Sequence, residues 1–364
     1  MSCCFVWRVN WTENEVQKLK NADCSDSLRA IIDNSFFKKD DIYVIVMDDK
    51  FRCPFLTEDN FCRIQKELGE EYLSHTCRIY PRQSIVSGNY VINCCNLSCY
   101  RVMDFLCNDK DCMKLENHAI NGGKFLEGVY ADSKVDMINH PELKFRHQLF
   151  EFFYEIISDD SYSIETSLIL GALAAQKLTE FINKGRCDLI PEIINSIKPQ
   201  LKNKAQIHNI DEIKPNQGLK IKFAVELHKI IMNSDLLDGI SENGIIDDEK
   251  YNEGVRKFSE AFADRPFAMR NIALNLWLEM KMPFKDKVLD LFSNYCYYVS
   301  ALAAIKLVGA AVFASNDDPE QAFKSLSAYV SRSFSHSSKK IRTVSELLKK
   351  YNCTSPAYLA LIIK

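Results

Sequence analysis

The feature that most constrains this chain is the uneven distribution of its cysteines. Of 14 cysteines, eleven lie in residues 1–112, and only Cys187, Cys296 and Cys353 follow. Secreted disulfide proteins are normally small and carry an export signal, but residues 1–16 show no basic segment followed by an apolar one. The sequence therefore predicts a reducing, cytoplasmic location, in which clustered thiols usually bind metal. The three late cysteines are expected to be small buried apolar residues.

Composition argues against two kinds of partner. The net charge is −3, so binding to nucleic acid by bulk positive charge is not expected. One apolar run, residues 295–315, approaches the length of a membrane span. Lys306 lies at its middle, where a charge costs roughly 2.5–3.5 kcal/mol. We expect a buried helix there and no membrane association.

The N-terminal third has mixed secondary-structure signals. Thr12 precedes one short helical segment, and Ser25 or Ser27 precedes a second at 25–37. Residues 41–47 are β-branched and apolar, which predicts a strand. Two apolar runs within residues 83–95 flank Ser-Gly-Asn and predict a hairpin.

From about residue 140 the apolar residues recur with the period of an α-helix. Five segments show this pattern: 143–158, 163–185, 218–235, 252–267 and 338–351. The predicted fold class is therefore α+β. We expect a small cysteine-rich, metal-binding α+β module at 1–115, a linker at 116–136 and a larger all-α helical domain at 137–364.

Three cysteines in the stretch from 53 to 82 form the centre of a possible metal site. Cys53 and Cys62 are separated by a turn-like segment, and Cys77 follows. Cys62 begins a predicted helix, and so does Cys99, with Ser98 as its expected cap. The positive end of a helix dipole favours the thiolate, which is the form that binds metal. Arginines that could offset thiolate charge flank these cysteines: Arg52, Arg63, Arg78, Arg82 and Arg101.

Packing is the alternative explanation for any single cysteine. Cys24, Cys107 and Cys112 are assigned to packing. Cys94 and Cys95 are adjacent on a predicted strand and face opposite ways, so at most one of them could join a site. For the group as a whole, a metal site is the better explanation, because eleven thiols in a third of the chain exceed what packing requires.

The segment "CPFLTEDNFCRIQKELGEEYLSHTCRIYPR" (53–82) resembles the flagellin lysine-N-methylase family. Weaker matches are "CCFVW" (3–7) and "LSCYRV" (97–102), where Tyr100-Arg101 replaces the family's Pro-Glu. The resemblance implies an iron–sulfur cluster, expected as [4Fe–4S] with zinc as the alternative. It also implies methyl transfer from S-adenosylmethionine to lysines of flagellin. By position, the ligands would come from Cys3, Cys4, Cys53, Cys62, Cys77 and Cys99.

The site for the methyl donor is not visible in the sequence. There is no GxGxG segment for a Rossmann-type site. The radical signature CxxxCxxC is broken, because Cys95 and Cys99 are followed by Val102. The aromatic residues 152–154 and those within 295–298 have helical spacing, which favours core over pocket. His75 is a possible ligand or base, although a surface helix position is favoured, and His147 and His228 are expected to pack.

Three hypotheses remain open. The first is a protein-lysine methyltransferase with an iron–sulfur cluster, acting on flagellin. The second is a non-catalytic, metal-stabilised module that binds a protein partner, and the third is a radical or redox iron–sulfur enzyme. Without the resemblance the second would lead, because the helical half shows no catalytic spacing. With the resemblance, the first leads.

Overall fold

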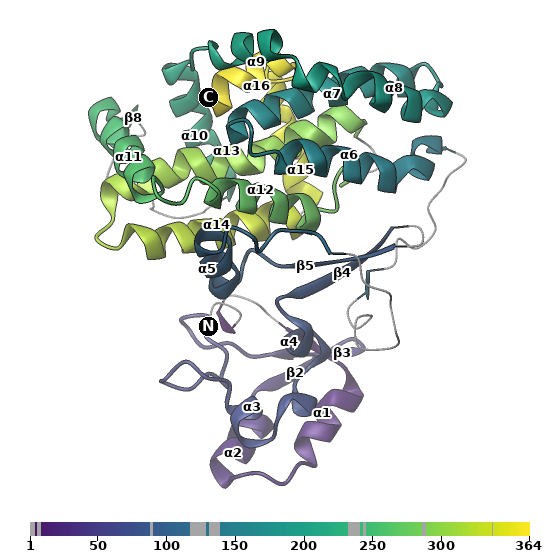
Figure 1. Ribbon diagram of the computed structural model, residues 1–364. Coiled ribbons are helices and arrows are strands. Elements are labelled where there is room, and N and C mark those ends of the chain that lie inside the picture. Colours follow the sequence, from purple (N-terminus) through teal and green to yellow (C-terminus); the bar gives the residue numbers. More distant parts are fainter. Residues whose placement is uncertain are drawn as a thin grey trace.

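The computed structural model describes residues 4–5, 9–87, 90–116, 129–130, 139–231, 241–242, 245–285, 289–336 and 338–364. Figure 1 shows a small N-terminal part of short helices and strands below a larger helical body. The mixture of helices and small, mainly antiparallel sheets confirms the α+β class.

Local capping signals fix the first two helices. Helix α1 (Glu13–Lys20) begins at Thr12, whose hydroxyl accepts a hydrogen bond from the Glu15 N–H while the Glu15 carboxylate accepts one from the Thr12 N–H. Helix α2 (Asp26–Asn34) begins at Ser25, the first of the two predicted caps. Both helices were expected from the sequence.

The second helix is shorter than predicted, because part of its expected range forms a strand. Strand β2 (Phe36–Lys39) pairs antiparallel with β3 (Ile42–Ile45), and β1 (Asn10–Trp11) pairs with the other edge of β3. The turn between β2 and β3 contains Asp40 at φ 54°, a left-handed conformation that aspartate tolerates better than most residues. Phe36 and Phe37 therefore pair with Ile45 and Val44 of β3 instead of extending α2, which ends at Asn34.

The remaining N-terminal elements are short helices. Helix α3 (Arg63–Glu67) is followed by Gly69 at φ 98°, a 3₁₀ turn (Glu70–Tyr72) and α4 (His75–Ile79), which Ser74 caps. Together with α1, α2 and the β1–β3 sheet they enclose a compact core. Its buried residues are Trp11, Val16, Leu19, Leu28, Ile32, Ile45, Phe55, Ile64 and Leu73.

The predicted hairpin is present as β4 (Arg82–Ser87) and β5 (Tyr90–Cys95), and β6 (Val129–Tyr130) pairs parallel with β4. Helix α5 (Tyr100–Asn108) follows. Buried side chains of this hairpin and of α5 pack into the core of the helical body rather than into the N-terminal core. The two cores therefore separate between Leu73 and Ile85, while the predicted domain limits at 115 and 136 stay a prediction.

Eleven further described helices build the larger body (Figure 1). They are α6 (Arg146–Ser158), α7 (Ile164–Asn183), α8 (Ile190–Ile197), α9 (Lys204–Asp211), α10 (Gln217–Ile231), α11 (Asp248–Ala261), α12 (Ala268–Glu279), α13 (Leu291–Ser315), α14 (Pro319–His336), α15 (Ser338–Lys350) and α16 (Pro356–Ile363). Short 3₁₀ turns (Pro141–Phe145, Cys187–Leu189, Gln200–Lys202) and the two-residue strands β7 (Ser241–Glu242) and β8 (Ile245–Ile246) complete it.

Helix α13 is the centre of this body and packs against α7, α11 and α14. Among the described helices it alone has the length and hydropathy of a membrane span, but 94% of its apolar window is buried inside the protein. Lys306, the charge within this run, places its Nζ 2.5 Å from Glu165 Oε1. The expectation of a buried helix is confirmed.

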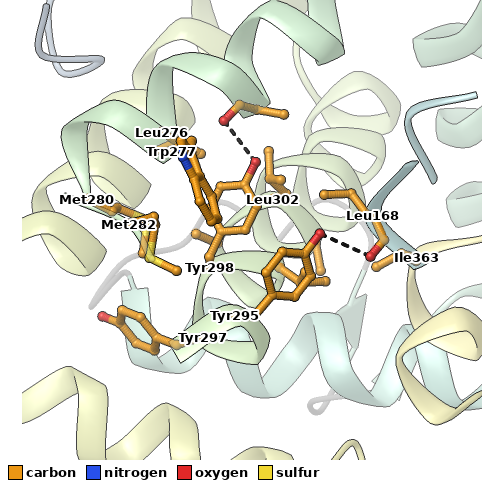
Figure 2. Close-up of a cluster of buried hydrophobic side chains, with 14 of the residues drawn as sticks. Leu168, Leu276, Trp277, Met280, Met282, Tyr295, Tyr297, Tyr298, Leu302 and Ile363 are labelled. Carbon is orange, nitrogen blue, oxygen red and sulfur yellow. Dashed lines mark hydrogen bonds between the residues drawn. The ribbon is translucent and has the colours of Figure 1, made fainter. Parts of the chain in front are cut away.

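The tyrosines of α13 are core residues, as their helical spacing indicated. Figure 2 shows Tyr295 and Tyr298 pointing into the core beside Trp277. Their hydroxyls donate to the backbone oxygens of Leu168 (3.1 Å) and Ala273 (2.9 Å). The Tyr297 hydroxyl donates to a backbone oxygen of α14. Each buried hydroxyl thus has a partner, so these rings stabilise the body without leaving polar atoms unsatisfied.

Candidate functional site

Backbone pairing gathers three of the six predicted ligand cysteines. The Cys53 N–H donates to the Cys4 oxygen at 2.8 Å, so the N-terminal segment lies against the segment that carries Cys53. Leu56 and Cys62 face each other in an antiparallel bridge, and the Leu56 N–H donates to the Cys53 oxygen at 3.0 Å. Cys4, Cys53 and Cys62 therefore lie on adjacent stretches of backbone. Cys3 lies outside the described residues.

A turn between Cys53 and Cys62 explains why these two residues come together. The Thr57 N–H donates to the Phe61 oxygen at 2.9 Å, and the Phe61 N–H donates to the Thr57 hydroxyl at 3.0 Å. Asn60 adopts φ 62°, which a short polar side chain tolerates. The turn-like segment in the sequence is thus a closed loop that returns the chain to Cys62.

Cys62 and Cys99 each occupy the N-cap position of a helix, α3 and α5, as their place in the sequence suggested. The expectation that Ser98 would cap α5 is wrong. The Ser98 hydroxyl donates to Asn96 Oδ1 instead, and the Cys99 N–H closes a turn on the Asn96 oxygen at 3.1 Å. This turn moves the helix start one residue on and places the thiol of Cys99 at the positive end of the helix.

Cys77 and Cys99 border a second location, a cleft of about 570 Å³ between α4 and the start of α5. Cys77 is exposed, and its N–H donates to the Ser74 hydroxyl that caps α4. Three of the predicted arginines also line the cleft: Arg78, Arg82 and Arg101. Arg82 lies 3.7 Å from Glu70, which also lines the cleft, and Arg101 lies 3.6 Å from the half-buried Asp104, so three arginines face one carboxylate in this lining.

Backbone contacts and the lining of the cleft thus connect the predicted ligands in two sets. Cys4, Cys53 and Cys62 form one, and Cys77 and Cys99 form the other. Within the described ranges, no three Cys, His, Asp or Glu side chains come together as a metal site. The donor types, the helix starts and the arginines suit a thiolate-bound centre.

The other cysteines and histidines behave mostly as packing residues. Cys107, Cys187, Cys296 and Cys353 are buried in the larger core, Cys112 packs against it, and Cys24 packs against the smaller one. His75 is an exposed residue of α4, as favoured. His147 stacks on Tyr90 with ring centroids 3.6 Å apart, and His228 is buried.

A buried carboxyl group in α12 was not found from the sequence. Glu279 is 1% exposed, accepts a hydrogen bond from the Leu97 N–H at 2.9 Å and contacts the Ser331 hydroxyl at 2.6 Å. Burial raises its pKa. An acidic residue inside the apolar run 272–282 was the available signal.

From Glu279 a chain of hydrogen bonds runs to the cysteine cleft. The Ser331 hydroxyl lies 3.1 Å from Asn96 Oδ1, which also accepts from Ser98. The Ser98 hydroxyl is 3.0 Å from the hydroxyl of Tyr80, and Tyr80 lines the cleft. The cleft and the helical body are therefore joined through buried polar contacts.

The helical body matches the FliB lysine N-methylase C-terminal domain over residues 150–362. The chain belongs to the FliB lysine N-methylase family. It is 23% identical to the lysine-N-methylase of Salmonella typhimurium (strain LT2) over 336 residues, covering 85% of this chain and 80% of that protein. The family resemblance of the cysteine segment is confirmed.

Two further relatives extend the FliB match. The lysine-N-methylase of Salmonella choleraesuis (strain SC-B67) is 24% identical over the same coverage. The flagellar biosynthetic protein FliU of Salmonella muenchen is 34% identical over 139 residues, covering 36% of this chain and 81% of that protein. No solved structure matches the chain. A match over 85% of the chain necessarily includes part of the cysteine-rich region that precedes the FliB C-terminal domain.

Proposed function

We propose that this protein transfers methyl groups from S-adenosylmethionine to lysine side chains of flagellin, in the cytoplasm and before flagellin is exported. The observation that carries the proposal is the match of the FliB lysine N-methylase C-terminal domain to residues 150–362. The names of the relatives add support, because two are lysine-N-methylases and a third is a flagellar biosynthetic protein.

The reaction is a displacement at the sulfonium methyl carbon. The lysine nitrogen forms the new C–N bond, the C–S bond breaks, and S-adenosylhomocysteine leaves with the electron pair on sulfur. The amine must lose its proton before it attacks. Arg78, Arg82 and Arg101 around the cleft would favour the neutral amine of a lysine that enters it, because nearby positive charge lowers an amine pKa.

We further propose that the N-terminal cysteines hold an iron–sulfur cluster, expected as [4Fe–4S]. Cys4, Cys53 and Cys62 would supply ligands from one side and Cys77 and Cys99 from the other. Cys3 remains a candidate on sequence position alone. A bound cluster would supply a clamp between segments that are far apart in the chain, so its binding would contribute to folding. We propose polar methyl transfer that needs no external reductant.

The metal proposal makes a direct prediction. Protein purified without oxygen should contain about four irons and four sulfides per chain. Cys53→Ser, Cys62→Ser and Cys77→Ser should each lose most of the metal. Cys187→Ser and Cys353→Ser are matched controls, since both thiols are buried in the helical body, and they should retain it. Stoichiometric zinc without acid-labile sulfide would contradict the cluster.

Two measurements test the reaction. Flagellin co-expressed with this protein should gain mass in steps of one CH₂ group per methylation, and flagellin expressed alone should not. Unmodified flagellin in the presence of folded, metal-loaded protein would favour the non-catalytic module instead. Methylation that requires dithionite and releases 5′-deoxyadenosine would replace the polar mechanism with the radical one.

A further inference from the structure

A second cavity is lined by residues of β5, α5 and α12. Helix α12 packs on both β5 and α5 (Figure 1). The volume of the cavity is about 320 Å³. Phe105 and Leu106 of α5, Met113 of the following turn and Asn275 of α12 are among its lining residues. Cavities of this size, mostly apolar with a few polar groups, are typical small-molecule sites.

Asn275 has an unsatisfied hydrogen-bond donor at this cavity. The side chain is 2% exposed, and its Nδ2 has no hydrogen-bond partner within the described structure. One turn earlier, Nδ2 of Asn271 donates to the oxygens of Leu106 (3.1 Å) and Asp109 (2.9 Å). A buried donor without an acceptor costs roughly 1–3 kcal/mol. The contrast between two amides on one helix leaves the Asn275 donor available to an acceptor on a ligand.

The walls of the cavity favour an uncharged, polarisable group. Phe105 supplies an aromatic face and Met113 a thioether. Cys94 and Cys112 also line it, and burial raises the pKa of both thiols, that of Cys112 to about 11, so both are neutral at pH 7. The one charged residue among the described lining residues is Lys114, whose Nζ is paired with Asp111 Oδ1 at 2.9 Å, and no carboxylate lines the cavity to attract a cation. A flat heterocycle with ring-nitrogen acceptors meets these conditions.

We propose that this cavity binds the adenine ring of the methyl donor, with Asn275 Nδ2 donating to a ring nitrogen. The proposal rests on the proposed function, which names S-adenosylmethionine as the donor. The position of the cavity supports the proposal. Cys95 lines the cavity and Cys99 lines the neighbouring cleft, and the two thiols are close enough to interact electrostatically. Helix α5 contributes residues to both the cavity and the arginine-lined cleft, so a methyl donor bound in the cavity would lie beside that cleft.

The test measures binding of S-adenosylhomocysteine to the full-length, metal-loaded protein by calorimetry. Asn275→Leu should weaken binding about tenfold or more, because the adenine nitrogen loses its donor. Phe105→Ala should also weaken binding, and because Phe105 is 50% exposed, this change should not disturb the core. Leucine in place of an unsatisfied amide should leave the thermal midpoint of Asn275→Leu unchanged or raise it.

Asn271→Leu is the matched control for stability. It removes the hydrogen bonds to Leu106, Asp109 and Cys112 and should lower the thermal midpoint, which Asn275→Leu should not do. Wild-type affinity in both Asn275→Leu and Phe105→Ala would overturn the adenine site while leaving the proposed function intact. Failure of the wild-type protein to bind S-adenosylhomocysteine at all would overturn the donor named in the proposed function, and the site with it.

Discussion

Lys220 shows how burial changes the chemistry of one side chain. It lies on α10, is 7% exposed, and neighbours Lys306 and Glu165. Burial, and then the positive charge of Lys306, lower its pKa from 10.5 to about 8. Between these two values the unfolded chain holds a proton that the folded protein has released. Stability contributed at this position therefore rises with pH across that range.

Replacing Lys220 with methionine should remove this dependence. Relative to wild type, Lys220→Met should be more stable at pH 7 by about 3 kcal/mol, and the difference should vanish as the pH rises towards 10.5. Denaturant unfolding at several pH values measures it. Lys222→Met is the control, because Lys222 is exposed two residues further along the same helix. Parallel pH profiles for wild type and Lys220→Met would contradict the prediction.

At the scale of elements, α11 and α13 approach each other closely at a glycine. A Cβ added to Gly254 would lie 2.1 Å from the Ala310 oxygen and 2.9 Å from the Ala314 Cβ. Alanine residues on α13 and a glycine on α11 thus bring the two backbones together. Since the first obstacle is backbone, a side-chain rotation cannot relieve it.

Gly254→Ala should destabilise the protein. On an open helix surface this change adds roughly 0.5–1 kcal/mol of stability, but here overpacking should cost about 1–3 kcal/mol. Thermal unfolding should show a lower midpoint. Gly218→Ala is the control near the start of α10, because the nearest atom to its added Cβ is 3.8 Å away, and its midpoint should stay or rise. A Gly254→Ala protein as stable as wild type would show that the helices can move apart freely.

The elements found from sequence are those whose signals are local. The Thr12 and Ser25 caps and the apolar period of the helical body depend on residues a few positions apart, so α1, α2, α6, α7, α10, α11, α13 and α15 were predictable, whereas α8, α9, α12, α14 and α16 were not identified. Strand β2 was not, because Phe36–Lys39 becomes a strand only through pairing with β3. The same limit applies to the Ser98 hydroxyl, which binds Asn96 in place of the helix end.

For the candidate site, sequence spacing identified the cysteines but not their grouping. Cys77 and Cys99 are far apart in the chain and border one cleft only because α4 and α5 meet there. Asn275 has no sequence signature, because an unsatisfied amide is visible only once its surroundings are known. Contacts of this kind depend on tertiary structure and lie beyond spacing and periodicity.

At the scale of the whole molecule, Glu279 joins the two parts of the fold. Its carboxyl group contacts Leu97, next to the hairpin, and Ser331 of α14. Burial raises its pKa, so the folded protein keeps a proton that the unfolded chain loses above about 4.5. This contribution to stability is present at low pH and declines as the pH rises through the folded-state pKa.

Glu279→Gln should preserve the connection, because the amide can accept from the Leu97 N–H and donate to the Ser331 hydroxyl, as a protonated carboxyl does. Glu279→Leu leaves the buried Leu97 N–H without an acceptor and should cost about 1–3 kcal/mol. The free energy of unfolding, measured at pH 5 and pH 8, should decrease less with rising pH for Glu279→Gln than for wild type. Equal stability of the Leu and Gln variants would show that the contact contributes nothing.

Each of the two cores also contains a buried tryptophan. Trp11 is 1% exposed in the N-terminal core, and Trp277 is fully buried in the helical body. Tyr298 lies 5.2 Å from Trp277, close enough to pass on its excitation energy, while Trp11 has Phe36 at 5.2 Å. Tyr43 is also the cross-strand partner of Trp11, so each tryptophan can collect excitation energy from a neighbouring tyrosine. A protein with both Trp7→Phe and Trp11→Phe would keep Trp277 of the helical body as its single tryptophan, so melting of that body can be followed by fluorescence without an attached dye.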